Sequence, residues 1–210
     1  MASGTGFTGD LGDKLWISPD LALALWDALF AAGLPHGLRP IGSEALNMAR
    51  IEAGFVSTNM DFIPAPQALR EDRVRSPFEL GLDWLIDWDK GHFTGRRALL
   101  AEQAKGSRWA LVGLDIAGNV SAEGALIYQN RKQVAGFVTA ALWSPVLKRN
   151  IALAQVERRF LGADGRASDL WVEIYALREL QYAKLMLKVA VVERAFFAPA
   201  RRRATPPGRF

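Results

Sequence analysis

The stretch that could do chemistry lies at the start of the chain. Positions 4–12, GTGFTGDLG, contain the GxGxxG spacing of a loop that binds the pyrophosphate of a dinucleotide. Such a loop needs a strand before it and a helix directly after it, because the helix N-terminus binds the pyrophosphate. Only three residues precede these glycines, and the aspartates among and after them favour a turn. The stretch therefore predicts a tight turn that leads into a strand at 14–17.

Other reactive side chains are few. The two histidines, His36 and His92, lie far apart in turn-rich segments without carboxylates at metal-ligand spacing. A surface position is favoured over a catalytic role for both, and no metal site is predicted. The serines lack the flanking glycines of a nucleophile elbow, so a hydrolase triad is not predicted. Trp84 and Trp88 stand next to acids, and a core position is favoured over a platform for a cofactor.

The composition is that of a folded chain. Half of the 210 residues are hydrophobic and 23% are charged, which suits one large domain or two small ones. There is no cysteine, so a disulfide scaffold, a thiol nucleophile and cysteine-bound zinc are excluded, and a reducing compartment fits. The sequence has neither a basic and apolar leader nor an apolar run of membrane-spanning length. We expect a soluble, cytoplasmic protein without membrane contact.

The net charge of +4 resides in the C-terminal tail. From Glu193 onward five arginines stand against one acid, which leaves 21 basic and 21 acidic residues in the rest of the chain. A neutral body with a basic tail does not suit a groove that neutralises many phosphates, so no nucleic-acid partner is predicted. The arginine run at 201–203 is interpreted as a solvated tail, with anion binding as the sharper alternative.

Two helices are predicted early in the chain. The apolar spacing of 19–33 indicates a helix that packs on a sheet containing the preceding strand. A second helix is predicted over 43–53, with Ala45, Leu46 and Ala49 on its core face and Met48 as a candidate fourth member. Both segments end at a glycine, the usual residue after a helix C-terminus.

The next part of the chain has weaker patterns. A long excursion over 55–75 has no clean period and contains one expected short helix at 66–70. The run 80–87 indicates a buried strand, and 96–102 indicates a short helix. A hinge at 105–107 is the candidate boundary between two parts of the protein.

Short strands separated by turn clusters dominate the second half of the chain. This pattern with little helix between the strands is typical of a small antiparallel barrel or sandwich. The six predicted strands are 109–116, 125–128, 133–139, 150–156, 170–175 and 185–192.

Five motifs follow one another along the chain. They are the glycine turn at 4–14, ALWDAL at 24–29, ARIEAG at 49–54, DKGHFTGRRAL at 89–99, and the barrel segments VTAA at 138–141, SP at 144–145 and IALA at 151–154, ahead of Phe196 and Phe197. In this order they resemble the glycine cleavage system T protein (aminomethyltransferase) family, with its dimethylglycine and sarcosine dehydrogenase and folate-dependent demethylase relatives. Each motif is weak alone, and the specificity lies in the shared order.

The resemblance implies an α+β fold with three parts. Residues 1–105 correspond to the C-terminal part of a folate-binding α+β domain, 106–200 to a small antiparallel β-barrel, and 201–210 to a basic tail. Family members have a long preceding region that completes the folate-binding domain and carries the aspartate implicated in catalysis. The resemblance covers only the later part of the family's chain, so a separate N-terminal half or a partner subunit is expected.

The resemblance also implies cofactor-binding residues. Phe7 matches the aromatic residue that packs near the folate in the family, and Lys14 replaces the acid that binds the pterin ring. This replacement reverses the chemistry, because a carboxylate accepts hydrogen bonds and an ammonium only donates them. Arg50 keeps the later arginine of its motif, in a ligand role or paired with an acid such as Glu52 or Asp83. Arg201 falls roughly on a family tyrosine close to the ligand.

A second position departs from the family pattern. Leu46 stands where the family has its substrate-binding arginine. The implied function is a fragment or split subunit of a tetrahydrofolate-dependent one-carbon transferase, inactive alone, whose donor is an amine, sulfonium or aryl ether. The alternative is a non-catalytic scaffold of the same fold that binds a partner. No catalytic residue is predicted within the chain.

Overall fold

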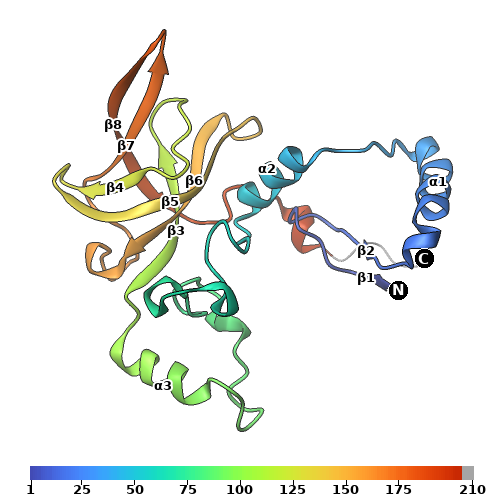
Figure 1. Ribbon diagram of the computed structural model, residues 1–210, viewed down its shortest axis with the longest axis horizontal. Coiled ribbons are helices and arrows are strands. Elements are labelled where there is room, and N and C mark those ends of the chain that lie inside the picture. The colour runs from blue at the N-terminus through green and yellow to red at the C-terminus, as the bar shows by residue number, and fades with distance from the viewer. Residues whose placement is uncertain (205–210) are drawn as a thin grey trace.

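The computed structural model describes residues 1–204, without the side chains of Glu71, Arg178 and Arg203. A closed barrel forms one part of the molecule, and helices and loops from the first half of the chain extend from it (Figure 1). Residues 205–210, part of the predicted basic tail, lie outside the described residues. Within 1–204 no helix has both the length and the apolar character that crossing a bilayer requires.

The barrel contains six antiparallel strands in the spatial order β3-β6-β5-β4-β7-β8. Their bounds are β3 Trp109–Ile116, β4 Leu126–Gln129, β5 Gln133–Ser144, β6 Arg149–Glu157, β7 Leu170–Arg178 and β8 Gln181–Val192. All six predicted strands are therefore confirmed, and several are longer than the sequence indicated. Closure leaves no unpaired strand edge and encloses a core that includes Leu114, Ile127, Val138 and Val172.

Three α-helices precede the barrel in the chain. They are α1 Ala22–Gly33, α2 Ser43–Ala53 and α3 Arg96–Lys105, and all three agree with predicted helices. Single 3-10 turns lie at Pro19–Leu21, Leu34–His36, Ala65–Gln67, Glu71–Arg73, Asp83–Leu85, Arg158–Phe160 and Ala200–Arg203. A two-stranded sheet pairs β1 Ala2–Ser3 with β2 Lys14–Leu15.

The last turn of α2 packs against the barrel. Ile51 from this turn joins Leu80, Leu111, Ile151 and Leu153 in a second apolar cluster. The predicted core face over Ala45 and Leu46 is wrong, because both residues are exposed. Only the C-terminal turn of the helix is buried, and this turn sets the position of the site described below.

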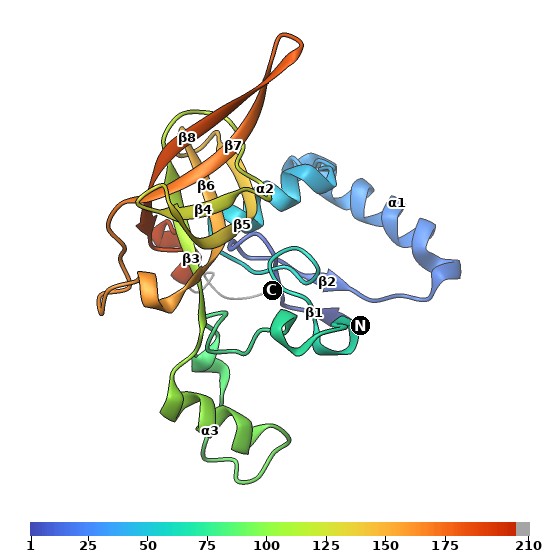
Figure 2. The same cartoon turned by 60° about the vertical axis from the view of Figure 1, so that its left-hand side comes forward.

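The prediction that α1 packs on a sheet is also wrong. None of its residues is buried, and its substantial contacts are with the flanking 3-10 turns. In both views α1 stands away from the barrel (Figures 1 and 2), and Figure 1 shows the extended connector that joins it to α2.

The predicted strand at 80–87 is replaced by turns. The N–H groups of Leu85 and Ile86 bond three residues back, to the carbonyls of Leu82 and Asp83. The Arg194 guanidinium takes up two further carbonyls of this run. Several of the backbone groups that a neighbouring strand would use are therefore already bonded, and the apolar run forms a turn beside the barrel.

Candidate functional site

Arg50 lies in the last turn of α2 and is fully buried. Its Nη1 lies 2.5 Å from Asp61 Oδ2, and both side chains are almost completely removed from water. The same guanidinium donates from Nε to Asn47 Oδ1 over 2.8 Å and from Nη1 to the carbonyl of Phe55 over 3.2 Å. These partners compensate the loss of hydration that burial imposes on a cation.

Asp61 joins this network to the barrel. Its Oδ2 accepts the backbone N–H of Ser57 over 2.8 Å, and its Oδ1 accepts the Thr139 hydroxyl over 2.5 Å. Thr139 stands at a register shift in the pairing of β5 with β6. Because a bulge of this kind interrupts the regular alternation of side chains, it re-aims one of them. The Thr139 hydroxyl consequently points toward Asp61, and the hydrogen bonds of this network connect α2 to the barrel.

Glu52 makes a second link between α2 and the barrel. Its Oε1 accepts the Ser144 hydroxyl over 2.5 Å, and its carbonyl accepts the N–H of Phe197 over 2.9 Å. Arg50 therefore pairs with an acid, as predicted, but the acid is Asp61 and not Glu52 or Asp83. Residues two apart on a helix do not face each other, so Glu52 points elsewhere.

Phe7 lines an apolar pocket of about 400 Å³ beside this anchored turn, here named the Phe7 pocket. Its ring lies over that of Phe55, with centroids 6.2 Å apart and planes 25° apart. The N-terminal turn, the end of α2, the 82–84 turn and the segment after β8 each contribute to the lining. The lining residues are Gly6, Phe7, Ala53, Gly54, Phe55, Val56, Leu82, Trp84, Arg194 and Ala195.

Gly54 permits the pocket's close backbone packing. It has a φ of +77°, and a Cβ there would collide with the carbonyl of Arg194. The Arg194 guanidinium in turn donates to the carbonyls of Leu80 and Gly81. Burial lowers the pKa of Arg194 from its ordinary value, and nearby carboxylates oppose this effect in part. The guanidinium therefore braces one wall of the pocket.

This geometry suits the face of a flat ring. The pocket has aromatic walls from Phe7, Phe55 and Trp84, and Trp84 is 75% exposed, which overturns the core position expected for it. None of the described residues lining the pocket carries a carboxylate. The pocket thus offers stacking surface, and the only charged side chain of its lining is already bonded to backbone carbonyls.

The other predicted site residues lie outside this pocket's lining. Lys14 is exposed in β2, opposite Ser3. Arg201 donates from Nε to Asp10 Oδ1 over 3.0 Å, and Arg202 lies 3.4 Å from Asp10 Oδ2. Hydrogen bonding from Arg201 is the main cause that lowers the pKa of Asp10. The arginines of the tail therefore hold the N-terminal turn, and their contact with folate stays a prediction, as does that of Phe7, Lys14 and Arg50.

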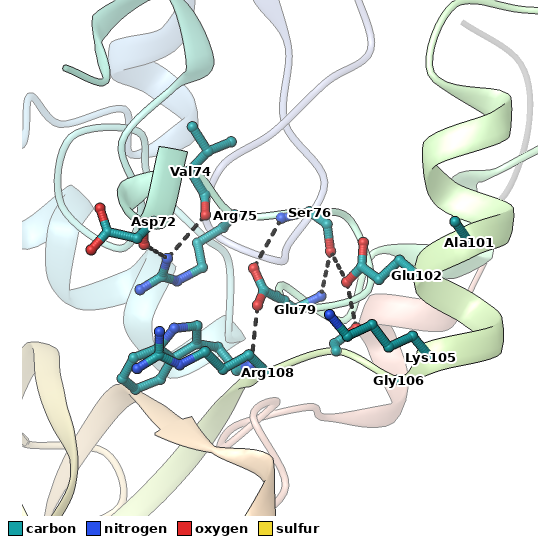
Figure 3. Close-up of a pocket in the computed structure, with 12 residues that line it drawn as sticks. Asp72, Val74, Arg75, Ser76, Glu79, Ala101, Glu102, Lys105, Gly106 and Arg108 are labelled. Atoms are coloured by element: carbon teal, nitrogen blue, oxygen red, sulfur yellow. Dashed lines mark hydrogen bonds between the residues drawn. The ribbon is translucent and has the colours of Figure 1, made fainter. Parts of the chain in front are cut away.

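A second hollow of about 780 Å³ is lined by the 72–79 segment, the end of α3 and the residues that lead from α3 into β3 (Figure 3). Glu102 Oε1 accepts the hydroxyls of Ser76 over 2.6 Å and Ser107 over 2.5 Å. Glu79 accepts the N–H groups of Ser76 over 3.3 Å and Trp109 over 3.1 Å. Both carboxylates are thus engaged by neutral donors. Glu102 ties α3 to Ser76 and Ser107, and Glu79 ties the turn at 76–79 to the first residue of β3.

Two of the three cations in the lining of this hollow, Arg75 and Arg108, are engaged as well. The guanidinium carbons of Arg75 and Arg108 lie 4.9 and 5.2 Å from the centre of the Trp109 ring. Arg75 also donates to two backbone carbonyls, and burial lowers its pKa. We therefore assign the hollow a structural role, and the Phe7 pocket is the candidate functional site.

Two family models match the chain. The model described as the GCVT N-terminal domain matches residues 1–90, and the glycine cleavage T-protein C-terminal barrel domain matches residues 110–197. The chain belongs to the glycine cleavage T-protein family. The Phe7 pocket is built from both matched regions, because Phe7 and Phe55 lie in the first and Arg194 in the second.

Curated relatives agree with this family. A trimethylamine-oxide aldolase from Ruegeria pomeroyi is 40% identical over 160 residues, which are 75% of this chain and 19% of that protein. An aminomethyltransferase from Caldanaerobacter subterraneus is 34% identical over 76% of this chain and 40% of its own length. Another aminomethyltransferase, from Halothermothrix orenii, is 36% identical over 74% of this chain and 41% of its own length. The chain thus spans about 40% or less of these relatives.

A solved structure shares the fold. The glycine cleavage system aminomethyltransferase T from Bartonella henselae superimposes with a TM-score of 0.74 at 20% identity. The match covers 94% of this chain and 49% of that chain. At this identity the likeness concerns the fold, in which the helical segments and the barrel recur together.

Sequence reasoning missed several residues of the site. Phe55 directly follows Gly54, the glycine that ends α2. This pair of residues could have predicted an aromatic side chain next to the turn after the helix. Asp61 lies in an excursion without a period, so no local pattern marked it as the partner of Arg50. Arg194 was assigned to the tail charge, although its side chain is half-buried against the 80–82 turn.

Proposed function

We propose that this chain supplies part of the folate site and the C-terminal barrel of a tetrahydrofolate-dependent one-carbon transferase. The Phe7 pocket carries the proposal, since an aromatic wall lies at the family's glycine turn. Membership of the aminomethyltransferase family, which is folate-dependent, supports it. A cytoplasmic location is part of the same proposal, on the support of the family alone.

The described residues that line the pocket fit one face of a pterin and offer no carboxylate to its polar edge. Phe7, Phe55 and Trp84 would hold the ring by stacking, as aromatic side chains do with flat ligands. Tetrahydrofolate would supply the nitrogen that accepts the one-carbon unit. Its amino and ring N–H groups need an acceptor, and Lys14 only donates. The missing acceptor is expected from another polypeptide segment.

The chain alone is accordingly proposed to be inactive. It spans about 40% of the aminomethyltransferases that it matches, and the family resemblance places the catalytic aspartate in the part without a counterpart here. The expected donor is an amine, sulfonium or aryl ether. The relative from Ruegeria pomeroyi, which is named for trimethylamine oxide, favours an amine-derived compound among these.

A non-catalytic scaffold is the second candidate. Lys14 stands where the family has an acid, and Leu46, which is 38% exposed on α2, stands where it has an arginine. A chain that has lost both ligand groups would keep the fold for binding a partner and would not bind folate.

A tetrahydrofolate titration separates the two candidates. The chain is titrated alone and after co-expression with the region of the Caldanaerobacter aminomethyltransferase that has no counterpart here, called the complementing region below. Binding in the mixture only, above that of the complementing region by itself, supports the split transferase. No binding in either sample supports the scaffold. Transfer of a one-carbon unit by the chain alone would contradict the proposed inactivity.

A further inference from the structure

The first 49 residues form an arm that the rest of the chain covers only in part, at contacts such as Phe7 with Phe55 and Asp10 with Arg201. The side chains between Met1 and Ala49 are all exposed or intermediate, and the first buried residue is Arg50. Large apolar side chains are among the exposed ones: Leu23 is 72% exposed, Trp16 61% and Trp26 54%. Large apolar side chains exposed this close together in the chain are typical of an interaction site.

Helix α1 is apolar around most of its circumference. Asp27 is its only charged residue and lies on the side opposite Leu25 and Leu29, between Leu23 and Ala31. A helix with one polar face packs on a single surface, whereas a helix that is apolar all round is normally enclosed. Figures 1 and 2 show α1 at the far side of the arm, away from the barrel. Its surroundings must therefore come from outside the described residues.

The sheet that precedes α1 in the chain is equally incomplete. β1 and β2 contribute two residues each, and reciprocal backbone bonds between Met1 and Trp16 extend the pair. A sheet of two strands is marginal in water unless further strands or a packed helix support it. Leu15 and Ile17 add exposed apolar side chains next to this pair. The arm thus presents both a strand edge and an apolar helix.

We propose that this arm docks on a polypeptide carrying the part of the T-protein N-terminal domain that has no counterpart in this chain. The partner would add a strand to the β1–β2 sheet and enclose α1 in an apolar core. This inference rests on the proposed function and names its partner. About half of the Bartonella aminomethyltransferase chain is unmatched, which is enough polypeptide to form such a core.

A second copy of the chain fits this surface less well. Two copies related by a twofold axis would bring the same patch of each chain together, so α1 would be covered along one side. Leu23, which faces away from Leu25 and Leu29, would then stay in water. A partner with its own sheet and apolar interior covers both features at once.

The test is co-expression with the complementing region, without folate. An affinity tag on that region should retain the chain, and light scattering after size exclusion should give a one-to-one complex. Leu23→Asp and Trp26→Asp should each weaken association at least about 30-fold, the effect of losing an anchor residue at an interface. Leu177→Asp is the matched control, because Leu177 is 62% exposed on β7 and lies outside the arm.

The outcomes are separable from those of the folate titration. Association that the two α1 variants lose and the Leu177 variant keeps supports the docking surface, even if the complex binds no folate. Self-association of the chain that Trp26→Asp abolishes would identify a second copy as the occupant and overturn the proposal. Failure to associate, or equal weakening by all three variants, would also overturn it.

Discussion

Arg50 Nη1 and Asp61 Oδ2 lie 2.5 Å apart in a pair almost wholly removed from water. The pair connects the helix that ends at the Phe7 pocket with a bulged strand of the barrel. A buried ion pair adds little over an apolar pair of similar volume, and loss of one partner is severe because the other charge stays buried. The position of the pocket therefore depends on this contact.

The first prediction concerns Asp61. Asp61→Asn should lower the free energy of unfolding by about 3–5 kcal/mol, because Arg50 keeps its charge without a counter-ion. Urea denaturation followed by tryptophan fluorescence measures the change. Asp72→Asn is the control: it removes the exposed pair with Arg70 and should cost less than about 1 kcal/mol. Similar losses in both variants would refute a special role for the buried pair.

The second prediction concerns Gly54. Gly54→Ala places a Cβ against the carbonyl of Arg194 and forces alanine into a left-handed conformation. Gly37→Ala carries the same conformational cost, at a φ of +82°, with no atom within 4 Å of the new Cβ. We expect about 1 kcal/mol of destabilisation for Gly37→Ala and at least about 1–3 kcal/mol more for Gly54→Ala. Equal unfolding midpoints would mean that the close approach of the 194–195 segment is absent.

The third prediction concerns Lys14. In the complex with the complementing region, Lys14→Glu should tighten tetrahydrofolate binding about tenfold or more, because a carboxylate accepts from the pterin where an ammonium cannot. Calorimetric titration provides the dissociation constants. Lys132→Glu makes the same charge change at an exposed position in the turn between β4 and β5, outside the proposed folate site, and should leave affinity unchanged. An equal gain in both variants would point to net charge as the cause.

The fourth prediction is a pH dependence at Asp10. Its pKa is lower in the folded protein than in the unfolded chain, chiefly because of the hydrogen bond from Arg201. The contact therefore contributes stability above the ordinary aspartate value of about 3.9 and is lost as the pH falls through the lowered pKa. Backbone amide signals at 200–204 should shift in that acidic range. In Asp10→Asn the same signals should be insensitive there, and an unchanged titration would assign the shift to another group.

The strands of the barrel were predictable because each is specified by residues close together in the sequence. Runs such as 109–116 and 150–156 are apolar, short and bounded by turn residues, and the same signals specify antiparallel pairing with neighbours in the chain. The helices α1, α2 and α3 likewise followed from spacing and terminal glycines. The sequence patterns did not predict contacts between residues that lie far apart in the chain.

The errors share one physical cause. The run at 80–87 has the apolar content of a strand, but Arg194, more than a hundred residues later, bonds its carbonyls. The partner of Arg50 lies eleven residues away in a loop with no period. The apolar spacing of α1 correctly predicted a helix, and it could not reveal that no surface of the described residues covers that helix.

Hydrogen exchange on the complex with the complementing region tests the central claim most directly. Backbone amides at 53–56 and 194–195 line the Phe7 pocket and should exchange more slowly when tetrahydrofolate is added. Phe7→Ala should remove this protection, whereas amides of the β7–β8 hairpin should be unaffected by the ligand in either protein. Protection confined to other parts of the complex, or undiminished in Phe7→Ala, would contradict the assignment of the folate site to this pocket.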